Sequence, residues 1–126
     1  MYKLINRKFG ENKMDDDMNE YFKAAQASLQ RLGQEHPDAM KGFQQFFGAV
    51  KTDGAISAKV KELIGIALSI AYQCKFCVAW HVKHALDQGA TKEEIIEASM
   101  VAGTLGGGPS LMFTKYVFKA LNDFAK

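Results

Sequence analysis

The chain has 126 residues, of which 48% are hydrophobic and 24% charged, and its formal net charge at pH 7 is +2. This length favours one domain with a sizeable core, and the composition is ordinary for a soluble globular protein. So small a positive excess gives no reason to expect nucleic-acid binding. The longest mostly apolar run, Leu63 to Tyr72, is only half the roughly 20 residues that a membrane-spanning helix needs.

The composition also favours helices over strands. Two prolines, many Ala, Lys, Gln, Leu and Met residues, and no convincing alternating run are typical of helical proteins. We predict an all-α domain of about six helices over residues 18–126, preceded by an N-terminal arm of residues 1–17. Residues 1–10 lack the apolar core of a secretory signal, so a cytoplasmic protein that does not enter membranes is expected.

Two helices are predicted in the N-terminal half. The first runs from Met18 to Gln34, where apolar residues recur at helical spacing. His36 ends it, because the residue before a proline avoids the α region. Pro37 suits the first turn of a second helix that continues to about Val50.

The next two helices hold the most informative residues. Ser57 is a candidate N-cap for a helix over 58–73 that is apolar nearly all round, which is typical of a buried central helix. A fourth helix, over 75–88, carries the cysteines, and Gly89 follows it in the position that often closes a helix.

The C-terminal part is predicted as two further helices. Thr91 and Glu94 form a capping-box pattern that opens a helix to about Thr104. The run Gly106-Gly107-Gly108-Pro109 ends it, and an amphipathic helix covers 110–124.

Both cysteines of the chain lie in one Cys74-x-x-Cys77 motif, with His81 four residues after Cys77. If Cys74 is already helical, these side chains share one helical stripe with His84 at about 100° per residue. The C-x-x-C spacing also puts the two sulfurs close enough to form a disulfide. A nearby imidazole can take the proton of a thiol whose ordinary pKa is about 8.5. The motif therefore favours thiol–disulfide redox chemistry.

Glu62 is a second candidate, twelve residues before Cys74 and near the start of the apolar helix. Its carboxylate would suit a proton relay, and burial would raise its pKa.

Three other interpretations of the cysteines remain open. They could be inert core residues, or zinc ligands together with His81 and His84, although one helix face rarely closes a tetrahedral site. The pair could also sense redox state in a helical oligomer that is not an enzyme. We expect neither a metal nor another cofactor.

Glu62, then Cys74-Lys75-Phe76-Cys77, then His81 resembles the motif of the alkylhydroperoxidase D-like branch of the carboxymuconolactone decarboxylase family. The resemblance extends over roughly 57–108 and includes Lys61-Glu62-Leu63, Gly89-Ala90-Thr91 and Glu93-Glu94-Ile95.

The resemblance implies an all-α fold that assembles into homotrimers or homohexamers, and it implies catalytic roles. Cys77 would attack the peroxide, Cys74 would supply a proton and close the disulfide, and His81 with Glu62 would relay protons. The implied activity is a peroxidase of the peroxiredoxin type, reduced by a dithiol or by a lipoyl-bearing protein.

The chain departs from the peroxidase motif at Phe76, where the peroxidase has a histidine directly before its second cysteine. An apolar residue there could line a pocket for an organic hydroperoxide. The decarboxylase branch of the family generally lacks the cysteine pair, so a decarboxylase acting on a small cyclic acid is the weaker alternative.

Overall fold

A computed structural model describes residues 17–125, and within this range every regular element is a helix. The all-α prediction is therefore confirmed for this part of the chain, while nearly all of the predicted N-terminal arm lies outside it. The described part of the chain has seven helices, where the sequence predicts about six, with these bounds: α3 (Met18–Glu35), α4 (Pro37–Lys51), α5 (Ala58–Ala71), α6 (Lys75–Asp87), α7 (Lys92–Val101), α8 (Gly103–Phe113) and α9 (Lys115–Phe124).

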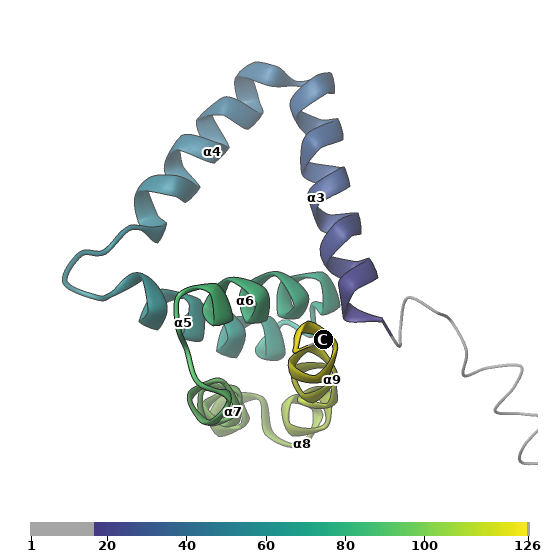
Figure 1. Cartoon of the computed structure of the whole chain (residues 1–126), viewed down its shortest axis with the longest axis vertical. Coiled ribbons are helices and arrows are strands. Elements are labelled where there is room, and N and C mark those ends of the chain that lie inside the picture. The colour runs from purple at the N-terminus through teal and green to yellow at the C-terminus, as the bar shows by residue number, and fades with distance from the viewer. Residues whose placement is uncertain (1–16, 126) are drawn as a thin grey trace, which may run out of the picture.

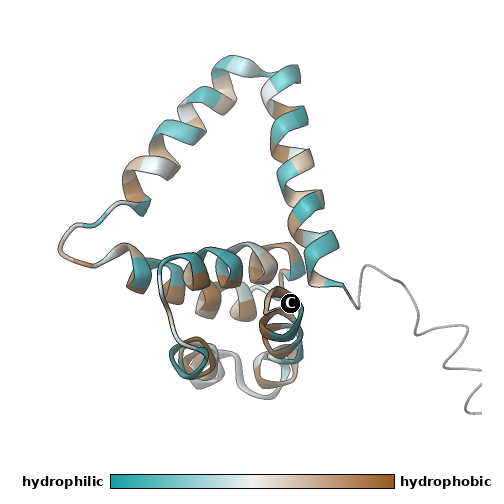
Figure 2. Ribbon diagram, in the orientation of Figure 1, coloured by the Kyte–Doolittle hydropathy of each residue, from teal (hydrophilic) through white to brown (hydrophobic). Residues whose placement is uncertain are grey.

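Helices α3 and α4 form a hairpin that leads away from the other helices and returns to them (Figure 1). Asp17 caps α3 by accepting a hydrogen bond from the Asn19 N–H, and Pro37 begins α4 as the sequence predicts. Only Met18 and Tyr21, in the first turn of α3, are buried, and α4 has no buried residue at all. Both helices carry hydrophobic and hydrophilic turns in alternation (Figure 2).

The core lies among α5, α6, α7 and α9. Six of its fully buried members are β-branched and come from these four helices: Ile66, Ile70, Val78, Val82, Ile95 and Val117. Met18 of α3 is buried against the same cluster. α5 and α6 pack directly against each other. This contact explains why α5 is apolar nearly all round, as a central helix should be.

The C-terminal helices depart from the sequence prediction. The capping box of Thr91 and Glu94 is present, but α7 ends at Val101, and α8 runs through the glycines with a kink at Gly107. Gly107 has φ 63° and ψ −146°, a conformation that glycine adopts at little cost. Pro109 then lies just after the kink, where a new helical turn tolerates proline.

The predicted last helix is divided in two at Thr114, although the backbone of this residue stays in the right-handed helical region. Thr114 separates α8 from α9, and its hydroxyl donates to the Leu111 carbonyl 2.5 Å away. Near the far end of α9, the Asp123 carboxylate accepts a hydrogen bond of 2.9 Å from the Met18 backbone N–H. The C-terminal helix therefore anchors the beginning of the α3–α4 hairpin.

None of the helices over 17–125 is long and apolar enough to cross a lipid bilayer.

Candidate functional site

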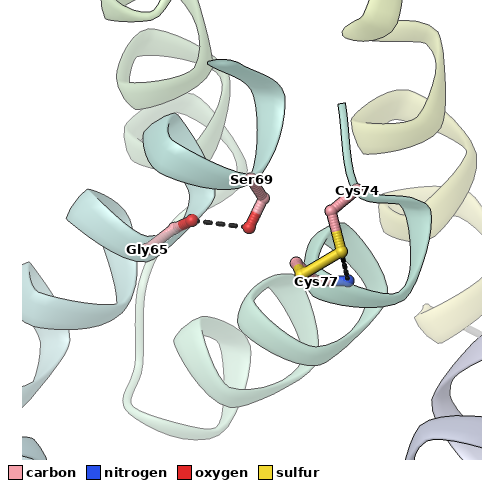
Figure 3. Close-up of a disulfide and its surroundings, with 4 residues drawn as sticks. All are labelled: Gly65, Ser69, Cys74 and Cys77. Atoms are coloured by element: carbon pink, nitrogen blue, oxygen red, sulfur yellow. Dashed lines mark hydrogen bonds between the residues drawn. A yellow bond between two sulfur atoms is a disulfide. The ribbon is translucent and has the colours of Figure 1, made fainter. Parts of the chain in front are cut away.

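Cys74 and Cys77 form a disulfide at the start of α6, with their Cα atoms 5.2 Å apart (Figure 3). Cys74 is the N-cap of the helix, and its Sγ accepts a hydrogen bond of 3.1 Å from the Cys77 backbone N–H. An N-cap sulfur lies against the unpaired N–H groups and the positive end of the helix dipole. The position therefore favours negative charge on Cys74 whenever the disulfide opens.

The turn before the disulfide contains the one described non-glycine residue with positive φ within 17–125. Gln73 has φ 54°, and its N–H bonds to the Ile70 carbonyl at the end of α5. The Cys74 N–H bonds to the Ser69 carbonyl in the same turn. The left-handed residue thus reverses the chain so that α6 begins beside the end of α5.

Glu62 and His81 come together across the α5–α6 contact. Oε2 of Glu62 lies 2.8 Å from Nδ1 of His81, and only 4% of the glutamate side chain is exposed. The sequence predicts that both residues belong to one site, but it predicts no contact between them. The structure shows that contact.

Lys51, the last residue of α4, binds the other oxygen of the same carboxylate. Its Nζ is 2.5 Å from Oε1 of Glu62. Burial raises the pKa of Glu62, but the hydrogen bonds from His81 and Lys51 together outweigh it and leave that pKa below its ordinary value of 4.5. The expectation that burial would leave the pKa of Glu62 raised is therefore wrong, because it took no account of the two partners.

The lowered pKa of Glu62 determines which nitrogen of His81 carries hydrogen. An ionised carboxylate can only accept hydrogen bonds, so Nδ1 must be the donor to Glu62. In the neutral imidazole the proton acceptor is then Nε2. His81 is thereby prepared to accept a proton from a group in the site.

Gly65 makes the approach of His81 to α5 possible. A Cβ added to Gly65 would lie 2.5 Å from Nδ1 of His81, closer than real atoms pack. One turn further along α5, Ser69 donates a hydrogen bond of 2.6 Å to the Gly65 carbonyl and lies beside the disulfide (Figure 3). A glycine inside a buried apolar helix signals such a close approach, and our reasoning from the sequence did not use it.

Two cavities meet at Cys77 and His81. The first, of about 610 Å³, lies between the α3–α4 hairpin and α6, and its other walls are almost entirely apolar: Leu29, Met40, Phe43, Phe47, Phe76 and Trp80 among them. The second, of about 520 Å³, lies between α4 and α5 and includes Lys51, Leu68, Ser69 and Tyr72. Cys77 lines both cavities, whereas Cys74 lines neither.

Phe76 lines the first cavity, as the sequence comparison with the peroxidase motif suggested it could. Its ring meets the edge of Tyr21 with 5.0 Å between centroids, and 42% of the residue is exposed.

His84 is not part of this site. Its Nδ1 lies 2.8 Å from the Trp80 carbonyl, and its ring packs on Trp80 and Phe22. Over residues 17–125 no three His, Cys, Asp or Glu side chains are grouped so that they could hold a metal ion.

Lys51 is the polar site residue that reasoning from the sequence missed. It lies at the end of a helix outside the stretch that carries the motif, and a lysine there looks like a solvated residue. Only the packing of α4 against α5 brings it to Glu62.

Comparison with known proteins finds relatives in sequence and in fold. A sequence model described as the carboxymuconolactone decarboxylase family matches residues 37–122. An uncharacterised protein of Cupriavidus necator is 42% identical over 93 residues, which cover 74% of this chain and 80% of that protein. A Paracoccus denitrificans protein, the uncharacterised protein 4 of the cox locus, is 32% identical over 100 residues, or 79% and 87% of the two chains.

Two solved structures share the fold. The apo form of a carboxymuconolactone decarboxylase family protein from Legionella pneumophila has a TM-score of 0.82 and 36% identity, covering 86% of this chain and 97% of its own. A Thermotoga maritima protein of the same family has a TM-score of 0.73 and 27% identity, covering 82% and 89%. For the Thermotoga protein an involvement in the antioxidative response has been suggested.

Proposed function

This chain belongs to the carboxymuconolactone decarboxylase family, in its alkylhydroperoxidase D-like branch, and from that premise we propose that it is a cysteine-based peroxidase that reduces organic hydroperoxides. One observation carries the proposal: a disulfide whose Cys77 lines two apolar cavities beside a histidine held by a buried glutamate. The antioxidative role suggested for the Thermotoga relative agrees with it.

The first step is attack by Cys77. His81 accepts the thiol proton at Nε2, and the thiolate attacks the outer oxygen of the hydroperoxide. The S–O bond forms as the O–O bond breaks, and the alkoxide leaves as an alcohol after it takes a proton from the relay. Cys77 is then a sulfenic acid.

The second step closes the disulfide. The Cys74 thiol, whose deprotonation is favoured by its place at the helix N-terminus, gives up its proton as its sulfur attacks the Cys77 sulfur and displaces hydroxide. The hydroxide takes up that proton and leaves as water. The Cα–Cα distance of 5.2 Å is suited to that bond.

The third step restores the dithiol. A thiolate of the reductant attacks the sulfur of Cys77, the one that the cavities reach, and Cys74 leaves as a thiolate accepting the Cys77 N–H. The second thiol of the donor then displaces Cys77, and the donor departs as a disulfide. A dithiol or a lipoyl-bearing protein partner can supply both thiols.

The apolar walls of the first cavity support an organic hydroperoxide over hydrogen peroxide. The side chains of Phe43, Phe47 and Trp80 form an apolar surface against which the carbon skeleton of an organic hydroperoxide can be buried away from water. Hydrogen peroxide has no apolar part to bury there.

The test uses full-length reduced protein and a stoichiometric dose of cumene hydroperoxide. Wild type should lose both thiols, and a Cys74→Ser variant should form a Cys77 sulfenic acid that dimedone traps. Cys77→Ser should consume no peroxide, and full activity in that variant would contradict the proposal.

A matched pair of histidine variants tests the relay. His81→Gln should slow peroxide consumption by about 100-fold or more, the usual contribution of a general base. His84→Gln, which changes a histidine three residues along the same helix and hydrogen-bonded to the Trp80 carbonyl, should react at nearly the wild-type rate.

A further inference from the structure

Lys51 contacts the Glu62 carboxylate and is placed to act on the cysteines through it. Its ammonium lies against the Glu62 carboxylate, 4.7 Å from the centre of the Phe47 ring and 5.9 Å from that of Trp80. Only 23% of its side chain is exposed. An ammonium enclosed by a carboxylate and two aromatic faces has lost much of its hydration, so its charge acts strongly on its neighbours.

The two oxygens of Glu62 have separate partners. Oε1 meets Lys51 from α4, and Oε2 meets His81 from α6. We propose that Lys51 is a positioning residue of the reaction, which keeps Glu62 ionised so that His81 donates from Nδ1 and accepts from Cys77 at Nε2. The proposal rests on the proposed function, since it acts through Glu62 and His81 on the attacking thiol.

The chemistry of the alternative states explains why the lysine matters. A buried carboxylate without a fixed cation takes up a proton more readily. A protonated Glu62 could donate to Nδ1, which would move the imidazole hydrogen to Nε2 and leave no acceptor for Cys77. A Glu62 whose only cation is His81 would instead favour an imidazolium, which is not a base either.

A second lysine makes it possible to separate this electrostatic role from simple anchoring. Nζ of Lys61 donates hydrogen bonds of 2.6 Å to the Val50 and Thr52 carbonyls, at the end of α4. Lys61 therefore ties α4 to α5 even when Lys51 is replaced. Replacement of Lys61, in turn, removes neither of the two side chains that bind the Glu62 carboxylate.

The experiment measures alkylation of Cys77 by iodoacetamide in the reduced full-length protein as a function of pH, with the label located by mass spectrometry. The titratable or charged groups that face Glu62 and Cys77 are His81 from α6, Lys51 from α4, and Lys61 and Tyr72 on the side of the second cavity. Lys51→Met should lower the alkylation rate at pH 7 about tenfold, which corresponds to a shift of one pH unit in the profile.

Three comparison variants define the outcome. Lys51→Arg, which keeps the charge, should recover most of the rate. Lys61→Met removes an equal charge and the hydrogen bonds from α5 to the end of α4. Its Cys77 alkylation rate should stay within about twofold of the wild-type rate, as is usual for a charge in contact with solvent. In a His81→Gln background Lys51→Met should have no further effect, because the two changes act through one chain of contacts.

An alkylation profile that is unchanged in a folded Lys51→Met protein overturns the proposal. The proposal is also overturned if Lys61→Met lowers the alkylation rate of Cys77 as much as Lys51→Met does, because Lys51 would then only anchor α4. If Lys51→Met does not fold, Lys51→Gln and Lys51→Arg are compared instead, and equal profiles for those two overturn it. Because alkylation needs no peroxide, a wild type without peroxidase activity would contradict the proposed function and leave this result standing.

Discussion

The imidazole of His81 occupies the space where any residue at position 65 other than glycine would place its side chain. A Cβ on Gly65 would lie 2.5 Å from Nδ1 and 2.8 Å from Cε1 and Cγ of His81. This ring, which lines the same two cavities as Cys77, is thus held between the buried Glu62 carboxylate and the Cα of Gly65.

Gly65→Ala should therefore damage the site through His81. The added methyl forces the imidazole away from Glu62, and overpacking of this kind costs about 1–3 kcal/mol of unfolding free energy. Urea denaturation and peroxide consumption measure the two effects. Gly33→Ala in α3, where an added Cβ meets nothing within 4 Å, is the control and should be neutral or stabilising by up to about 1 kcal/mol. Full activity in Gly65→Ala would show that the close approach is unimportant.

Glu62 should make the protein sensitive to acid. Its pKa in the folded state lies below 4.5, so as the pH falls the unfolded chain takes up this proton first. The contribution of Glu62 to the unfolding free energy is then complete above the unfolded pKa, and it is lost as the pH falls through the folded one.

Glu62→Gln should accordingly lose less stability between pH 6 and pH 3 than wild type does, as measured by urea midpoints. The exposed acid Glu97 is the control, and Glu97→Gln should follow the wild-type curve. Parallel curves for wild type and Glu62→Gln would contradict the expected depression of the carboxyl pKa.

Phe76 should contribute to substrate preference. If it contacts the apolar part of an organic hydroperoxide, Phe76→Ala should lower kcat/KM for cumene hydroperoxide by about tenfold, which corresponds to about 1.4 kcal/mol of lost apolar contact. The value for hydrogen peroxide should change little. Phe118→Ala, on α9 and outside both cavities, should alter neither value. An equal loss for both peroxides would mean that Phe76 supports the motif and does not select the substrate.

The protein should also assemble into homo-oligomers, with a trimer or hexamer expected. Large apolar side chains remain exposed on the described chain, including Leu105 at 97%, Met112 at 75% and Phe46 at 69%. A soluble monomer rarely exposes so many together. Analytical ultracentrifugation at micromolar concentration should find a species larger than 14.0 kDa, and a monomer there would refute the expectation.

The parts of the site that could be predicted from the sequence are those that are close together along the chain. Cys77 and His81 lie one helical turn apart on α6, and Cys74, the non-helical N-cap of that helix, is three residues before Cys77, so local geometry alone brings the three together. Thr91 and Glu94 form their capping box for the same reason, because a cap needs only neighbouring residues. Glu62 could be proposed from its place in an apolar helix, but only the resemblance favoured it over a solvated acid, since its contact with His81 crosses from α5 to α6.

Lys51 and the C-terminal helices show what local patterns leave out. The pairing of Lys51 with Glu62 depends on how α4 returns to the core, which no spacing rule predicts. The glycine run predicts a helix end, yet the helix resumes beyond Gly107, because only that residue leaves the helical conformation.

The short span of the disulfide determines what reduction can do to the molecule as a whole. The cysteines are three positions apart, so the bond closes a loop of about four residues, for which chain entropy predicts about 2 kcal/mol, against nearly 5 for a loop of about 100. The helices that form the core are joined by side-chain packing and do not depend on this bond. Opening it should change the first turn of α6 and little else, so the same folded molecule is expected to exist in both oxidation states.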